Sequence, residues 1–111
     1  MEIRYEHETG WPSQLGLHKR ISAYARTDRA SAFKVGITNS PETRASQYRS
    51  NGSKYHEMIV LYQTTSDKHV REVERIFCDY YAGYADNLIG GGGGPKGEGP
   101  YFLYVVVARL L

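Results

Sequence analysis

Basic side chains gather in one third of the chain. Residues 19–54 contain eight lysines and arginines against two acidic residues, a balance of +6, whereas the whole chain carries only +2. Tyr24, Phe33, Tyr48 and Tyr55 are interleaved with these bases. Cationic groups bind phosphates and aromatic rings stack on bases, so this pattern is typical of a nucleic-acid-binding surface. A mildly basic, solvated surface gives the same pattern, and charge alone does not separate the two interpretations.

The composition bounds the class of protein. A chain of 111 residues forms one small domain, here residues 1–111. Leu, Ile, Val and Phe together number only 23, and ten tyrosines supply further buried area. The single cysteine, Cys78, excludes an internal disulfide and favours a cytoplasmic protein. No apolar run approaches the roughly 20 residues of a membrane helix, so no membrane partner is expected.

Two strands and a helix are predicted in the first half of the chain. Arg20–Arg26 and Ala32–Thr38 are typical of two strands joined as a hairpin. Ser40 is a good N-cap and Pro41 suits the first helical position, which predicts a helix ending near Arg49. The preceding residues 1–18 contain only a short alternating run, which leaves an edge strand and a dimer contact as alternatives.

The second half predicts a strand, a helix and a final strand. Glu57–Gln63 indicates a strand, and apolar residues at helical spacing indicate a helix from 67 to about 81. A glycine-rich connection at 90–100 then leads to a buried strand at Tyr101–Val107. The expected fold is α+β: a small central antiparallel sheet flanked by helices, in the order ββαβα, with an extra C-terminal strand.

The order of polar residues along these elements resembles the GIY-YIG nuclease superfamily. In that family the first strand carries a G-I-Y tyrosine and the second carries a Y-I-G-like triplet about ten residues later. An arginine on the first helix, a glutamate on the second and usually an asparagine follow. The matching positions, within about residues 20–90, are Tyr24 in S-A-Y, Lys34 in K-V-G, then Arg44, Glu74 and Asn87.

The resemblance implies metal-dependent hydrolysis of phosphodiester bonds. Such a reaction needs a base, a cation for the phosphorane and usually a metal held by a carboxylate. By family analogy Tyr24 would act as the base or position the water, and Arg44 would clamp the scissile phosphate. Glu74 would hold one Mg²⁺ or Mn²⁺ ion. Asn87 would orient its loop or form a hydrogen bond near the metal.

This sequence departs from the family pattern at two positions. Lys34 replaces the second tyrosine, and its ammonium group could stabilise the phosphate or help to lower the pKa of Tyr24. No histidine follows Arg44 at the spacing of some members, where Tyr48 and Arg49 stand instead.

Two glutamates compete for the metal position. On the predicted helix Glu74 lies roughly 80° from the centre of the apolar stripe and Glu72 about 120°, at about 100° per residue. A metal ligand must border the sheet, so the geometry favours Glu74 over Glu72.

So small a domain has no room for a separate DNA-binding module. We therefore expect low sequence specificity or selectivity for DNA structure, with DNA favoured over RNA. Because one active site cuts one strand at a time, nicking or a homodimer is expected. The residues expected to bind nucleic acid around the site are Arg26, Tyr48, Arg49 and Lys54.

Two alternatives to a nuclease remain open. The first is a non-catalytic nucleic-acid-binding or interaction domain on the same scaffold, with Lys34 as the sign of lost chemistry. The second is a structural α+β domain without a nucleic-acid role, for which DNA binding would be absent even at low salt.

Overall fold

Strands and helices alternate in the computed structural model, which describes residues 1–9, 14–25, 30–81 and 97–109. The elements are β1 (Glu2–Glu8), α1 (Gln14–Ala25), β2 (Ala30–Thr38), α2 (Pro41–Ser50), β3 (Glu57–Thr64), α3 (Asp67–Tyr80) and β4 (Tyr101–Arg109). The sheet has the order β1-β3-β4-β2. The predicted α+β class, with helices flanking a small sheet, is confirmed. The sheet is mixed, because β1 joins β3 in parallel while β4 is antiparallel to both of its neighbours.

The strand predicted at Arg20–Arg26 is wrong, because these residues belong to the end of helix α1 and the segment after it. Leu17 and Ile21 are buried and Tyr24 packs beside them, which is the i, i+4, i+7 spacing of one helix face. A sequence segment that begins at Arg20 omits Leu17, and the apolar and polar residues that remain in it seem to alternate as they would in a strand. The chain order within the described residues is therefore βαβαβαβ rather than ββαβα followed by a strand.

The alternating run near the N-terminus forms an edge strand. In β1, Ile3 packs against the core under α2, while Arg4 and Glu6 reach partners on the α1 side of the sheet. This residue-by-residue alternation between two faces is the normal geometry of a strand. It supports the edge-strand alternative for this segment.

The two other helices agree with the sequence prediction, and so does the predicted cap of α2. Ser40 Oγ accepts a hydrogen bond from the Thr43 amide at the start of α2, and Ser66 Oγ caps α3 through the His69 amide. Helix α2 ends before Gly52, whose φ of +66° is the left-handed conformation that glycine tolerates. In the described part of the chain, no helix has the length and apolar character needed to cross a bilayer.

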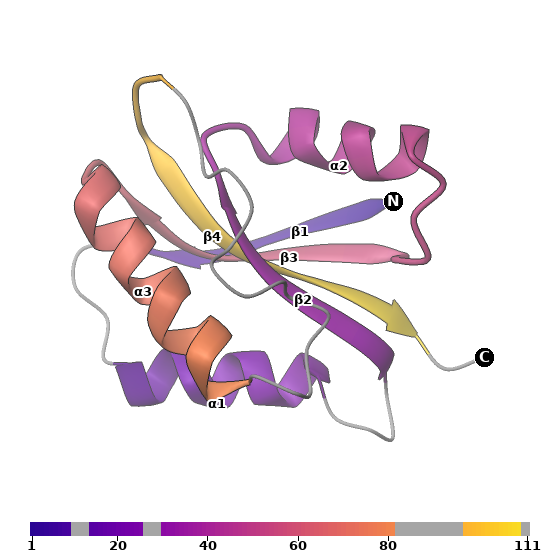
Figure 1. Ribbon diagram of the computed structural model, residues 1–111, viewed down its shortest axis with the longest axis horizontal. Helices are drawn as coiled ribbons and strands as arrows, with labels where there is room; N and C mark the ends of the chain where they lie inside the picture. Colours follow the sequence, from indigo (N-terminus) through magenta and orange to yellow (C-terminus); the bar gives the residue numbers. More distant parts are fainter. Residues whose placement is uncertain (10–13, 26–29, 82–96, 110–111) are drawn as a thin grey trace.

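The sheet separates two hydrophobic clusters. Helix α2 covers one face, and α1 and α3 cover the other (Figure 1). The larger cluster lies under α1 and α3 and includes Val35, Leu103 and Val105, whereas the smaller one lies under α2 and includes Tyr104 and Val106. Strand β4 is covered on both faces, which explains its nearly continuous apolar sequence. Most of the predicted glycine-rich connection at 90–100 lies outside the described residues.

Candidate functional site

Three of the predicted site residues come together at the edge of the sheet formed by β2. Lys34 lies on this strand, Arg44 on α2 and Glu74 on α3. Glu74 is half-buried, and burial raises the pKa of its carboxyl group above the usual 4.5. Nearby cations oppose this rise, in the order Arg71, Lys34 and Arg44. The carboxylate therefore lies among positive charges contributed by three different elements.

The face of helix α2 that lies toward the sheet carries two polar side chains among its buried residues. Pro41, Arg44, Ala45 and Tyr48 follow the i, i+3, i+4, i+7 spacing of one face, and only Pro41 and Ala45 are fully buried. Arg44 and Tyr48 are half-buried at positions where a purely structural helix would carry apolar residues. This placement fixes a guanidinium and a phenol one turn apart, beside β2 and β4.

A pair of tyrosines forms the centre of the site. The hydroxyl groups of Tyr48 and Tyr104 lie 2.9 Å apart in a hydrogen bond. Tyr104 lies opposite Gly36 across the β2–β4 ladder. A Cβ atom on Gly36 would lie 2.4 Å from the Tyr104 hydroxyl oxygen, so only glycine leaves room for this ring.

The environment of Tyr104 keeps its phenol protonated. Its side chain is only 2% exposed, and burial raises the pKa of Tyr104 well above its usual value. The neighbouring Tyr48 raises this pKa further, Arg44 lowers it and Glu74 raises it. Because both Arg44 and Glu74 act on Tyr104, the phenol pair belongs to the same site. We call Lys34, Arg44, Tyr48, Glu74 and Tyr104 the β2-edge cluster.

Cations and aromatic rings continue from this cluster along the α2 side of the sheet. The Lys34 Nζ atom lies 5.9 Å from the centre of the Tyr48 ring, within the range of a cation–π interaction. Tyr48 meets Tyr55 edge to face at 5.7 Å, and Lys54 Nζ lies 5.8 Å from the Tyr55 ring. Arg49 is exposed in the last turn of α2. Of the predicted nucleic-acid residues, Tyr48 thus belongs to the cluster, Lys54 lies one ring away from it at Tyr55, and Arg49 follows Tyr48 on α2.

Tyr24 does not belong to this cluster, contrary to the spacing argument. It lies on α1, and its hydroxyl group donates a hydrogen bond of 2.6 Å to Glu6 Oε2 on β1, the strand at the opposite edge of the sheet. Burial and the neighbouring Glu6 raise the pKa of Tyr24. Regular chain spacing did not predict this position, because Tyr24 is helical and faces another edge of the sheet. Arg26 and Asn87, also expected near the site, lie outside the described residues.

The two glutamates of α3 differ in exposure, as their positions on the helix predict. Glu72 is exposed to solvent and Glu74 is half-buried beside the cations, so the geometry favours Glu74 for a metal. Burial raises the pKa of Cys78 to about 11, which leaves an inert thiol one turn beyond Glu74.

Glu74 is the member of the β2-edge cluster that could hold Mg²⁺, through one carboxylate. Mg²⁺ is commonly held by one or two carboxylates, with water and substrate phosphate completing its shell. Glu74 supplies one such oxygen donor at the edge of the cluster. Among the residues that the structure describes, no group of three or more His, Cys, Asp or Glu side chains gathers around a potential metal position.

Tyr104 is the site residue that sequence reasoning missed. It lies in an apolar run that predicts a buried strand and nothing more. The available signal was Gly36 in the middle of β2, because a glycine inside a strand often marks the close approach of another group. Only the β2–β4 pairing reveals that this group is the Tyr104 phenol.

The β2-edge cluster thus combines two phenols, two cations and a carboxylate contributed by β2, α2, α3 and β4. This set can bind a phosphate group, hold a divalent cation and move a proton. The chain matches no protein-family model, no curated protein and no solved structure.

Proposed function

We propose that this protein is a divalent-metal-dependent endonuclease that hydrolyses phosphodiester bonds in DNA, with the β2-edge cluster as its catalytic site. The observation that carries the proposal is the meeting of Glu74, two cations and a phenol pair at one edge of the sheet. Phosphodiester hydrolysis uses a carboxylate for the metal, cations for the phosphate and a group that takes a proton from water.

Each member of the cluster has a role that its chemistry supports. The planar guanidinium of Arg44 suits two phosphate oxygens at once, and the ammonium group of Lys34 adds a second positive charge. Glu74 would hold Mg²⁺ or Mn²⁺. When bound, such an ion neutralises charge on the phosphate and favours ionisation of a bound water. The phenol pair supplies proton transfer.

The resemblance to the GIY-YIG superfamily is proposed with one change. In that family a tyrosine-bearing strand accompanies the strand of the second motif. Strand β4 pairs with β2 here and places Tyr104 directly opposite Gly36 of the K-V-G triplet. We therefore assign to Tyr104 the family position first given to Tyr24. The tyrosine-bearing strand would then come last along the chain instead of first.

The surface around the cluster supports a substrate recognised mainly through its backbone. Lys54 and Arg49 are exposed cations, and Tyr48 and Tyr55 are half-buried rings beside them. Phosphate contacts of this kind position a nucleic acid without reading its sequence. The expected preference is for DNA structure, such as nicks or flaps, with little sequence specificity.

The decisive experiment compares two glutamates on the same helix. Purified protein is incubated with supercoiled plasmid and Mg²⁺ or Mn²⁺, and an EDTA sample serves as the metal-free control. We expect nicked plasmid from the wild type and a loss of cleavage of about 10²-fold or more with Glu74→Gln. The matched variant Glu72→Gln, which changes an exposed carboxylate, should cleave like the wild type. Equal cleavage by both variants would contradict the assigned site.

A non-catalytic nucleic-acid-binding domain is the second candidate. It is favoured by the three cations around Glu74, which make the same edge attractive to phosphate without any reaction. In that case Arg44→Gln would weaken DNA binding at low salt, and no variant or metal would produce cleavage.

A further inference from the structure

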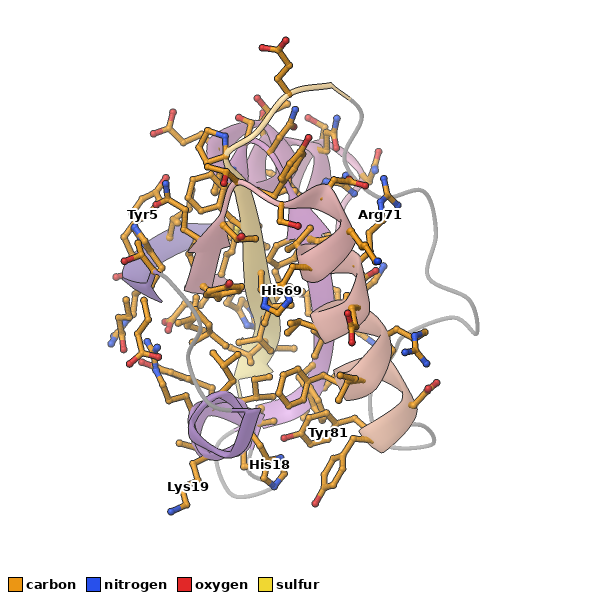
Figure 2. All side chains as sticks on the ribbon, turned by 90° about the vertical axis from the view of Figure 1, so that its left-hand side faces the viewer. Tyr5, His18, Lys19, His69, Arg71 and Tyr81 are labelled. Atoms are coloured by element: carbon orange, nitrogen blue, oxygen red, sulfur yellow. The ribbon has the colours of Figure 1, made fainter. Side chains whose placement is uncertain are left out.

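Strand β1 forms the outer edge of the sheet on the side opposite β2. Among the strands that the structure describes, its only neighbour is β3. Five of its seven residues are exposed, and Tyr5 in the middle is 50% exposed. Figure 2 shows Tyr5 at the margin of the molecule on this side. An exposed edge strand offers backbone donors and acceptors with which a further strand can pair.

The backbone of β1 shows which of its groups face outward. The Glu2 amide donates a hydrogen bond of 3.1 Å to the carbonyl group of His56, just before β3, so the backbone of Glu2 points toward β3. Successive residues of a strand point their backbone groups to opposite sides. Arg4 therefore also faces β3, and the backbone groups of Ile3 and Tyr5 face the outer edge. A further strand can form its central hydrogen bonds at Tyr5.

The charges of β1 select one register for pairing with a second copy of the chain. In a symmetric antiparallel pair the two-fold axis passes beside one residue, which lies opposite itself. An axis at Arg4 or at Glu6 would place like charges directly opposite each other, which destabilises a strand pair. An axis at Tyr5 instead places Arg4 opposite Glu6 of the second copy, and it gives the longest overlap of the two strands.

The side chains on both faces of β1 fit this register. On the α2 side Tyr5 lies opposite Tyr5 of the second copy, and aromatic pairs of this kind stabilise neighbouring strands. On the α1 side Arg4 turns Nε toward Glu57, at 3.1 Å, and its guanidinium group has further N–H donors for a second carboxylate. Only the outermost pair, Glu2 opposite Glu8, brings like charges together.

We propose that β1 is a homodimer interface, at which two copies of the chain pair antiparallel about Tyr5 and form one continuous eight-stranded sheet. The two β2-edge clusters lie at the outer edges of this sheet, on the strands farthest from the interface. The interface does not depend on the proposed nuclease function. Together with that function, it gives the protein one active site for each strand of duplex DNA.

A proline at the centre of the interface tests the backbone pairing. In sedimentation equilibrium, the mass of the wild type should rise with concentration from 12.6 kDa toward twice that value. Tyr5→Pro removes the outward amide and leaves the β1–β3 hydrogen bonds, because an edge strand tolerates proline where the nitrogen faces outward. The matched variant Tyr5→Ala loses the same ring and keeps the amide. We expect a dissociation constant about 10-fold or more higher for Tyr5→Pro than for Tyr5→Ala.

Two charge reversals test the register. Glu2→Lys turns the outermost pair into one of opposite charge and should tighten the dimer, whereas Glu6→Lys faces Arg4 and should weaken it. Each substitution changes two symmetric pairs, so we expect a change of about 2- to 30-fold in the dissociation constant, in opposite directions. Both variants change the net charge by the same amount. A shift of both in the same direction would therefore contradict the register.

The remaining outcomes are equally decisive. A wild type that stays at 12.6 kDa at every concentration, or equal dissociation constants for Tyr5→Pro and Tyr5→Ala, would overturn the proposal. Circular dichroism checks that each variant is folded, and the charge reversals decide the matter if Tyr5→Pro is not. A dimer that cleaves no plasmid would leave the interface standing and refute the nuclease proposal. Cleavage by a protein that is always monomeric would do the reverse.

Discussion

At both edges of the sheet a tyrosine, a glutamate and an arginine lie close together, but their surroundings differ. At the β1 edge Tyr24 donates to Glu6, and Arg4 Nε lies 3.1 Å from Oε1 of the buried Glu57. At the β2 edge Glu74 and Tyr104 lie among cations. Figure 2 places Tyr5 of β1 and Arg71 of α3 on opposite sides of the molecule.

The difference lies in what each polar group does for the fold. At the β1 edge Arg20 donates hydrogen bonds to the backbone carbonyl groups of Glu6 and Leu61, so it joins α1 to two strands. The same helix is also joined to the end of α3, where the hydroxyl group of the C-cap residue Tyr81 forms hydrogen bonds with Ser22 Oγ and His18 Nδ1. Figure 2 labels His18 and Tyr81 at this contact. These contacts are structural. At the β2 edge the half-buried Lys34, Arg44 and Glu74 come from three different elements and lie beside a pair of phenols. A carboxyl group with a raised pKa among such charges is associated with functional sites.

The largest expected effect comes from filling the space under Tyr104. Gly36→Ala places a Cβ atom 2.4 Å from the Tyr104 hydroxyl oxygen and 2.5 Å from Cζ, so the ring must move. We expect the free energy of unfolding to fall by about 1–3 kcal/mol and cleavage to be lost. Urea denaturation and the plasmid assay measure the two effects. Gly52→Ala is the control, since it has a strained φ but open space, and a larger loss in that variant would contradict the packing argument.

Next in size is the removal of the ion pair between the exposed Arg4 and the buried Glu57 at the β1 edge. Arg4→Met leaves the Glu57 carboxylate, 2% exposed, without its arginine. We expect a loss of about 1–3 kcal/mol in the free energy of unfolding. Cleavage per folded molecule should be unchanged. The double variant with Glu57→Gln measures the coupling between the two residues. A loss of cleavage in folded Arg4→Met would show that the β1 edge takes part in the reaction.

Tyr24→Phe should have a smaller effect. The variant loses one exposed hydrogen bond to Glu6, at a cost of about 0.5–1.5 kcal/mol. Thermal unfolding measures this cost, and the plasmid assay should give wild-type cleavage. Abolished cleavage with an intact fold would restore Tyr24 as the catalytic tyrosine and would break the contrast between the two edges.

The smallest expected effect concerns the stability of the β2 edge. Burial raises the pKa of Glu74, so ionised Glu74 is disfavoured in the folded state. Wild-type stability therefore falls as pH rises from the usual carboxyl value of 4.5 through the raised one. Glu74→Gln lacks this dependence and should have a slightly higher Tm at neutral pH, with the difference vanishing below 4.5. A lower Tm at neutral pH would show that Glu74 stabilises the fold.

Local signals in the sequence were sufficient for α2, α3, β3 and β4. Ser40 and Ser66 cap the two helices, and apolar periodicity marks the strands and the buried face of α3. Helix α1 was missed because its buried residues Leu17 and Ile21 fall across the boundary of a short alternating segment. A period of two and a period of 3.6 cannot be separated over so few residues.

Part of the β2-edge cluster could be predicted from the sequence, because local signals were sufficient for the elements that carry it. Lys34, Arg44 and Glu74 lie on correctly predicted elements, and packing of those elements on the sheet brings them together. Tyr104 depends on the pairing of β4 with β2, which lies far away in sequence. Strand order is set by the packing of the whole sheet, so chain spacing alone did not predict that Tyr104, and not Tyr24, lies beside Arg44 and Glu74.

The central position of β4 also bears on how the chain folds during synthesis. Among the strands that the structure describes, β2 pairs only with β4, whose residues 101–109 leave the ribosome more than sixty residues after those of β2. Until then β1 and β3 can form a parallel pair, while β2 carries its apolar residues Phe33, Val35 and Ile37 without a strand neighbour. Such long-range pairing folds slowly and exposes strand edges to other chains. Strand β4, which completes the phenol pair, is therefore the last of the four described strands to emerge. The nascent protein cannot form the β2-edge cluster before β4 has joined the sheet.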